Sequence, residues 1–446
     1  MEFHTTAPAT DPSVPVWPVS RGYAWTVFAL GFGLLLSDYM SRQVLNAVFP
    51  MLKAQWLLSD AALGSLSGVV ALTVGVLTFP MSLVADRWGR VRSLLIAAVL
   101  WSLATLGCAI SANYGEMFVG RLFVGIGEAA YGSVGIAVVL SIFPLTMRAT
   151  LSGAFIAGGA FGSVLGVALG GAVAQVAGWR WAFAAMGLFG LVLAAVYGIV
   201  VKESRLKPQG RSANDTDGTT THEPLRGHLP RLFSSVSVIS AYIGSGLQLF
   251  VAATLLAWLP SFFDRYYHMA PARAGAVAGV FALIIGIGMI AGGIASDRIS
   301  ATAPIRKWGV AVACSLSSLV LLSLAFRLPT GPAQLAALAA GCLLSAGTAG
   351  PAAAMVANLT PASVAATAFA TLTLANSLLG LAPGPAVTGA LADRIGLLGA
   401  LRVVPLTAVA ASVAFLIGRH WYERDLLRIT GLAARAETRT PSEVSS

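Results

Sequence analysis

The sequence predicts an all-α membrane protein with twelve transmembrane helices, arranged as two pseudo-symmetric six-helix bundles. Hydrophobic residues make up 57% of the 446 residues and charged residues only 10%, apolar stretches recur along the whole chain, and the two halves share short motifs. Soluble proteins carry about 25% charged residues, so there is too little charge here to cover a soluble surface of this size. The chain is therefore expected to lie in a lipid bilayer.

A membrane-spanning helix needs about 20 mostly apolar residues. The chain contains twelve such stretches, at 23–49, 62–84, 93–112, 117–141, 151–176, 182–201, 236–260, 274–295, 308–326, 334–356, 366–390 and 400–418. They predict a polar tail (1–22), a first bundle (23–201), a linker rich in Gly, Pro, Ser and Thr (202–235), a second bundle (236–418) and a final tail (419–446).

The distribution of basic residues predicts the orientation of these helices. With the amino terminus placed inside, 19 of the 28 Lys and Arg residues fall on cytoplasmic segments. That asymmetry follows the positive-inside rule, so both termini are expected in the cytoplasm of a multi-pass cell-membrane protein, in a bacterium the inner membrane. It also accounts for the net charge of +10 without a nucleic-acid partner. The protein is expected to act as a monomer.

Several classes of site are disfavoured by the motifs. The three cysteines, Cys108, Cys314 and Cys342, lie in apolar segments without CxxC spacing, so neither a disulfide framework nor a zinc site is indicated. A GxxxxGK[ST] phosphate loop and an HExxH motif are both missing from the sequence, which disfavours a primary pump and a membrane hydrolase. The sequence therefore predicts a protein that is not an enzyme and needs no metal or cofactor.

Two pairs of motifs relate the halves of the chain. The segment "VADRWGR" follows the second expected helix and "ASDRIS" follows the eighth, which places Asp86 and Asp297 211 residues apart. Gly171 and Gly389 end the fifth and eleventh helices in similar contexts and are 218 residues apart. These near-equal offsets indicate duplication of a six-helix unit. Parallel repeats of this kind occur in transporters whose site lies near the midplane between the halves.

The motifs also carry a family resemblance. The segment "MSLVADRWGRVR" (81–92) resembles the major facilitator signature G-x-L-A-D-R-x-G-R-[RK], with Ser82 in place of the usual Gly. "GRLFVGIGEAA" (120–130) resembles the helix 4 element of that superfamily. "DYMSRQVL", "LSDAALGSLSG" and "PGPAVTGALADRIG" are most similar to the spinster-like branch, with the anion:cation symporters a close second. Those branches usually read N-Y-x-D-R in helix 1, whereas here Ser41 takes the place of the acid and Asp38 that of the Asn.

Apart from Arg402, near the start of the twelfth stretch, four formally charged residues lie within the expected helices, namely Asp38, Arg42, Arg121 and Glu128. A charge in hydrocarbon costs at least about 2.5–3.5 kcal/mol and persists where it faces a partner or a water-filled cavity. Asp38 and Arg42 are four residues apart and share a helix face. The resemblance implies that helices 1 and 4 line a central cavity, so we expect the four side chains to converge there.

These residue types suggest proton-coupled binding of an anion. Carboxylic acids inside a membrane are common in proton relays, so Glu128 and Asp38 are the expected proton-coupling residues. The planar guanidinium groups of Arg42 and Arg121 suit bidentate capture of a carboxylate or phosphate. Asp38 and Arg42 could instead form a structural ion pair, and Arg121 could reach the interface by snorkelling.

The remaining candidates are uncharged residues of the second half and the loop motifs. Gln248 and Asn376 are expected either to contact substrate or to bond between helices. The resemblance implies that the loop motifs form a conformational latch. The alternative is that their basic residues only anchor the loops on the cytoplasmic side. The latch residues are Asp86, Arg87, Gly89, Arg90, Asp297 and Arg298. The spaced glycines 158, 162, 166 and 170 predict close backbone packing of the fifth helix.

The sequence thus predicts a secondary active transporter that moves a small organic anion or amphiphile by alternating access with proton coupling. Its partners would be that substrate, protons and the bilayer. A lysolipid, sphingolipid-type or drug exporter of the same fold is the alternative that the spinster-like resemblance implies. A receptor or scaffold without transport is disfavoured, because it would gain nothing from intramembrane charges.

Overall fold

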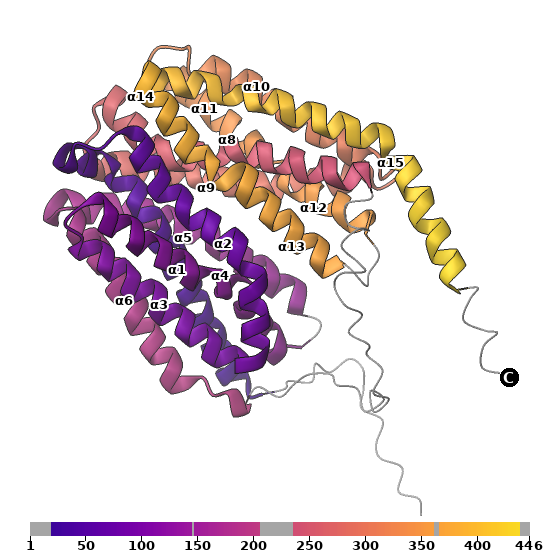
Figure 1. Ribbon diagram of the computed structural model, residues 1–446, viewed down its shortest axis with the longest axis horizontal. Helices are drawn as coiled ribbons and strands as arrows, with labels where there is room; N and C mark the ends of the chain where they lie inside the picture. Colours follow the sequence, from indigo (N-terminus) through magenta and orange to yellow (C-terminus); the bar gives the residue numbers. More distant parts are fainter. Residues whose placement is uncertain (1–18, 145–146, 206–234, 361–364, 438–446) are drawn as a thin grey trace, which may run out of the picture.

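The structure is a computed structural model that describes residues 19–144, 147–205, 235–360 and 365–437, and helices account for the regular structure of these ranges. Figure 1 shows the helices of the first half lying together on one side of the molecule and those of the second half on the other. The first half contains α1 (Arg21–Trp56), α2 (Asp60–Trp88), α3 (Arg90–Ile110), α4 (Tyr114–Ile142), α5 (Arg148–Ala177) and α6 (Trp179–Val200).

The second half has the same plan with more interruptions. Its elements are α8 (Val236–Tyr267), α9 (Pro271–Ser300), α10 (Arg306–Ala325), α11 (Pro332–Ala346), α12 (Ala349–Asn358), α13 (Ala365–Asn376), a π-helix (Ser377–Leu381), α14 (Pro383–Val403), a short 3₁₀ turn (Val404–Leu406) and α15 (Thr407–Glu437). Helices α11 and α12 form one crossing, 332–358.

The described helices accommodate the twelve expected spans. Ten segments of the described chain are long and apolar enough to cross a membrane, and the last of them, Thr367–Arg428, contains the eleventh and twelfth expected helices. Those two separate at Gly396, whose φ of 75° lies in the left-handed region that favours glycine. Helix α4 takes the place of the fourth expected span.

Proline explains the irregular eleventh helix. Pro383 and Pro385 have no N–H group, so the carbonyls one turn earlier lose their usual helical partners. The chain responds with a π-helical turn, in which the N–H of Ala382 donates to the carbonyl of Ser377 at 3.0 Å. Such π-turns often mark functional sites.

The expected boundary at 418 is too early. Helix α15 continues to Glu437, and Tyr422 and Asp425 on the extension are buried. The carboxylate of Asp425 accepts hydrogen bonds from the hydroxyl of Ser235 at 2.7 Å and from the N–H of Ser237 at 2.9 Å. This side chain therefore caps the start of α8, so the first part of the extension, up to Asp425, packs against the second bundle.

The two bundles are in contact at one end of the molecule and inward from it to mid-depth. We call this end the Asp60 end; it carries the turns at 56–60, 110–114, 177–179, 267–271 and 393–397. The opposite end, the Arg87 end, carries the turns at 88–90, 200–205 and 300–306. A Cβ atom added to Gly171 would lie 2.5 Å from the carbonyl oxygen of Pro271, and one added to Gly275 would lie 2.6 Å from that of Val167. Gly389 approaches the backbone carbonyl of Asp60 even more closely.

These contacts are related by the repeat that the sequence predicts. Gly171 at the end of α5 meets the start of α9, and Gly389 in α14 meets the start of α2. Side chains larger than hydrogen would hold the bundles apart at these points, so the glycines allow the Asp60 end to be closed.

Candidate functional site

The glycine ladder of α5 determines which face of α1 looks toward α4. A Cβ atom at Gly162 would lie 2.9 Å from the carbonyl oxygen of Leu36, and one at Gly166 would lie 2.7 Å from Cα of Met40. Two residues correspond to about 200° around a helix. Asp38 and Arg42 therefore lie on the side of α1 that faces away from α5.

An ion pair joins α1 to α4 at this face. The Nε atom of Arg42 lies 3.6 Å from Oε2 of Glu128, and the exposed fractions of the two side chains are 21% and 4%. Asp38 is buried on the same face, one turn from Arg42, and interacts electrostatically with both residues. The observed ion pair is thus between Arg42 and Glu128.

Each of the two acids has an oxygen that makes no bond to the described part of the chain. Oδ1 of Asp38 and Oε1 of Glu128 are buried without a hydrogen-bond partner there, as is the hydroxyl of neighbouring Ser41. A buried ionised carboxylate is costly unless its oxygens are bonded. The arrangement therefore suits groups that gain and lose a proton more than a permanently satisfied structural salt bridge.

Arg121 takes part in a different way from that expected. Its side chain is fully buried, and Nη1, Nη2 and Nε donate to the backbone carbonyls of Ser41 at 2.9 Å, Arg42 at 3.1 Å and Leu66 at 3.3 Å. Burial excludes snorkelling, and three of the five N–H donors of the guanidinium are bonded to backbone carbonyls. In this structure Arg121 fastens the turn of α1 that carries Arg42.

The two amide candidates of the second half differ in exposure. Gln248 is fully buried in α8 and donates through Nε2 to the hydroxyl of Ser318 on α10 at 2.9 Å, which is a bond between helices. Asn376 is half-buried at the junction of α13 and the π-helix, and its amide oxygen has no partner among the described residues. The Oε1 atom of Gln248 also lacks a partner among the described residues, but Gln248 is fully buried, so Asn376 is the one of the two that is partly exposed.

The expected latch residues lie at the Arg87 end, away from the closed interface. Arg87, Arg90, Asp297 and Arg298 are exposed; the side chain of Asp86 lies outside the described part. Gly89 has a φ of 91°, and the carboxylate of Glu203 accepts from the N–H groups of Arg90 and Val91 at 3.2 and 2.8 Å. Glu203 therefore caps α3, a role that the sequence analysis missed.

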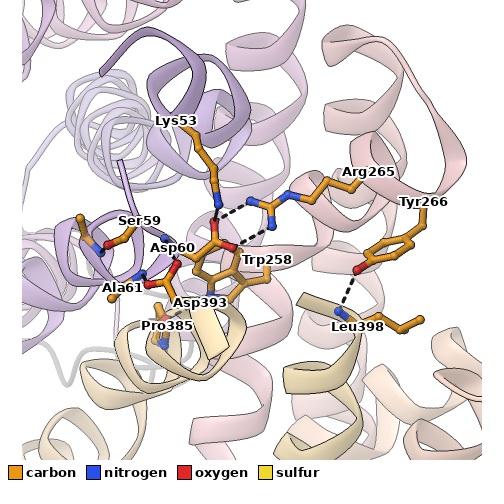
Figure 2. A network of polar contacts seen from close by, with 11 residues as sticks. Lys53, Ser59, Asp60, Ala61, Trp258, Arg265, Tyr266, Pro385, Asp393 and Leu398 are labelled. Carbon is orange, nitrogen blue, oxygen red and sulfur yellow. Dashed lines mark hydrogen bonds and ion pairs between the residues drawn. The ribbon is translucent and has the colours of Figure 1, made fainter. Parts of the chain in front are cut away.

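A charged network at the Asp60 end was also missed. Figure 2 shows Lys53, Arg265 and Asp393 converging on Asp60 at the start of α2. The Asp60 carboxylate accepts from Arg265 at 2.6 and 2.8 Å and from Lys53 at 2.6 Å. The Asp393 carboxylate accepts from the N–H groups of Asp60 at 2.7 Å and of Ala61 at 2.9 Å.

A smaller polar group lies on α1 between this network and Arg42. The side-chain amide of Asn46 donates to Gln43 at 2.6 Å and to the carbonyl of Leu256 on α8 at 3.4 Å, and its oxygen accepts from Ser67 at 3.1 Å. Polar contact across the bundles thus extends inward from the Asp60 end. The signal in the sequence was the unbroken run of polar residues from Ser41 to Gln43 with Asn46.

A groove of about 350 Å³ lies elsewhere, between α3 and α4, lined by apolar residues such as Leu103 and Phe123 with Glu116 beside them. The oxygens of Glu116 already accept from the N–H of Ala112 and the side chain of Asn113. Leu103 and Phe123 are about half exposed on the outer surface of the helices. None of the candidate site residues lines this groove, so we do not consider it the substrate site.

Comparison with known proteins identifies transporters among the proteins that this chain resembles. The family model of the Major Facilitator Superfamily matches residues 31–385. A gallate transporter of Pseudomonas putida is 28% identical over 346 residues, which cover 71% of this chain and 75% of that protein. Protein spinster of Drosophila melanogaster is 27% identical over 295 residues, 65% of this chain and 48% of that protein.

An uncharacterised MFS-type transporter, EfpA, of Mycobacterium tuberculosis is 32% identical over 180 residues, 40% of this chain and 34% of that protein. The chain thus spans between about one third and one half of the length of these last two relatives. Among solved structures, an inward-facing, unoccupied bacterial homologue of the human lysosomal transporter spinster has a TM-score of 0.80 at 18% identity. It covers 91% of this chain, and 99% of its own length is covered.

Proposed function

Since the chain belongs to the major facilitator superfamily of transporters, we propose that it is a secondary active transporter that couples proton movement to transport of an organic anion. The ion pair between Arg42 and Glu128, with Asp38 beside it, is the observation that carries the proposal. We further propose that both termini face the cytoplasm, which the distribution of Lys and Arg supports.

Arg42 would bind the substrate, and Glu128 would control when the Arg42 guanidinium is free to do so. The guanidinium is partly exposed, while its carboxylate partner is almost fully buried. At 3.6 Å the pair is longer than a charge-assisted hydrogen bond of about 2.7–2.9 Å. Protonation of Glu128 removes its charge and releases Arg42, which can then bind the carboxylate of a substrate in a bidentate manner.

Asp38 would be the second proton site. Both acids have buried oxygens without partners among the described residues, and two basic groups, Arg42 and Arg121, interact electrostatically with Glu128. Two acids and two bases together are neutral. A substrate anion and a proton that enter together keep this balance, so they enter the cluster at less electrostatic cost than either alone.

Arg121 would be a positioning residue rather than a substrate ligand. It bonds to the carbonyls of Ser41 and Arg42, so it holds the α1 backbone at the point from which the Arg42 side chain leaves. On the opposite bundle Asn376 is the proposed substrate contact, and its partial exposure together with its unpartnered amide oxygen supports that role. Gln248, which bonds Ser318, is proposed to brace α8 against α10.

The substrate class follows from a partly exposed cation, Arg42, beside largely apolar helices. The intramembrane acids and bases of the cluster all lie on α1 and α4, whereas Gln248 and Asn376 in the second half are uncharged. A carboxylate with an apolar body fits such a site. The similarity to a gallate transporter supports an aromatic or aliphatic carboxylate, and the similarity to spinster proteins keeps lysolipid-type amphiphiles as the second candidate.

The test uses purified protein in liposomes that contain a pH-sensitive dye. Carboxylates, lysophospholipids and cationic drugs are added in turn, and the proton flux that each one triggers is recorded. The proposal predicts flux with carboxylates that disappears in Glu128→Gln. Glu423→Gln makes the same chemical change at an exposed position of α15 and should leave the flux unchanged.

Two results would contradict the proposal. Undiminished carboxylate-dependent proton flux in Glu128→Gln would remove that residue from the coupling. A response confined to lysophospholipids would replace the carboxylate with an amphiphile as the substrate.

A further inference from the structure

The start of α2 is held by both bundles at once. Asp60 has a side chain only 3% exposed, and it accepts from Lys53 of its own bundle and from both terminal nitrogens of Arg265 on α8. Asp393 of α14 accepts from the first two N–H groups of α2. A helix N-terminus carries a partial positive charge, so Asp393 is here paired with a backbone dipole rather than with a side chain.

The charges are divided equally between the bundles. Lys53 and Asp60 belong to the first bundle, and Arg265 and Asp393 belong to the second. All four meet at a single residue, Asp60, as Figure 2 shows. If the bundles separate here, each takes away one acid and one base.

We propose that these four residues exchange partners when the Asp60 end opens. Asp60 keeps Lys53, while Arg265 leaves Asp60 and pairs with Asp393, which has left the N-terminus of α2. The exchange rests on the alternating access of the proposed function. Its consequence is that neither bundle exposes an unpaired charge in the open state, so the energetic cost of opening is reduced.

Arg265 and Asp393 lie close together in the closed state, so little movement is needed to pair them. Arg265 and Asp393 each bond to Asp60, one to its side chain and one to its backbone nitrogen, so both lie beside the same residue already. Asp264, next to Arg265 and half-buried, also interacts electrostatically with it. Asp264 is therefore the competing partner that the experiment has to separate from Asp393.

The populations of the two states can be measured by distances between spin labels. Val176 on α5 and Thr330 before α11 are exposed residues of different bundles near the Asp60 end and outside the network. Both are replaced by cysteine after the three native cysteines are replaced by alanine. Asp60→Asn removes the charged partner of Arg265 in the closed state, so the open population should rise about tenfold.

The decisive variant combines Asp60→Asn with Asp393→Asn. An amide oxygen can still accept from the start of α2, but it cannot neutralise Arg265. Exchange therefore predicts that the second substitution lowers the open population again, by about threefold. If Asp393 only caps the N-terminus of α2, the opposite result is expected, because a weaker contact with α2 should raise the open population further. Lys53→Gln provides an independent variant. In the open state Asp60 would then have no partner, so the open state is destabilised and the closed state should become more populated.

Every outcome decides the proposal. A further rise of the open population in the double variant would overturn the exchange. A fall with Asp264→Asn instead of Asp393→Asn would overturn the assignment of the partner. A single unchanged distance in all variants would also overturn it, whereas transport in liposomes is measured separately and decides the proposed function on its own.

Discussion

Gly275 on α9 offers a direct test of the closed Asp60 end. It faces the backbone of α5 across the interface between the bundles, where an added Cβ atom would lie 2.6 Å from the carbonyl oxygen of Val167. Ordinary contacts of this kind begin at 3.4 Å. The obstacle is backbone, which cannot move aside by a rotamer change, so Gly275→Ala should force α5 and α9 apart.

The magnitude follows from the size of this overlap. The methyl group is short of an ordinary contact by about 0.8 Å, and overpacking at a well-packed contact costs about 1–3 kcal/mol. In the alternative state the Arg87 end is closed and the Asp60 end is open, so α5 and α9 are apart here and the methyl group causes no overlap. The ratio of open to closed Asp60 ends should then rise by about 5- to 150-fold.

The assay is the distance between spin labels at Val176→Cys and Thr330→Cys described above. Gly107→Ala on α3 is the matched control, because a Cβ atom there meets nothing within 4 Å. Gly275→Ala should increase the long distance and Gly107→Ala should not. Identical distance distributions in the two variants would refute the view that backbone contact between α5 and α9 holds this end closed.

Three further predictions concern single residues. Arg121→Met removes three hydrogen bonds to carbonyls of α1 and α2; it should destabilise the protein by about 3 kcal/mol or more and lower Tm in detergent, and a Tm equal to wild type would contradict its positioning role. Glu203→Gln weakens the cap of α3 and should cost about 1 kcal/mol with transport kinetics preserved, so a changed KM would argue against a structural role. Asn376→Ala should raise KM for the carboxylate about tenfold, whereas Gln248→Met should leave KM unchanged; equal effects of the two variants would remove Asn376 from the substrate site.

The membrane fold could be predicted because it depends on composition and periodicity. Low charge and apolar stretches determine where helices can cross, since every backbone group in lipid must be bonded within the helix. The glycine spacing in α5 likewise reports on close packing without any knowledge of the partner helix. The end of α15 was misplaced because the residues after 418 are polar, and their burial depends on contacts such as Asp425 with Ser235, which are distant in sequence.

The members of the charged cluster could be predicted from the sequence, but the groups to which each member bonds could not. A charge on a membrane helix is visible in the sequence, so Asp38, Arg42, Arg121 and Glu128 could be identified as a group. Whether Arg121 bonds an anion or a carbonyl depends on how far α4 is rotated against α1, which no local pattern encodes. The network of Asp60 escaped notice because its residues lie at helix ends, where charges are common and only the tertiary structure brings them together.

The central claim is that Glu128 couples protons to substrate held by Arg42. The most direct measurement compares two activities of Glu128→Gln in liposomes: accumulation of a labelled carboxylate driven by a pH gradient, and exchange of labelled for unlabelled carboxylate without a gradient. An amide at 128 mimics the protonated acid, so the account predicts that exchange persists while gradient-driven accumulation is lost. Loss of both activities with intact folding, or retention of both, would contradict it.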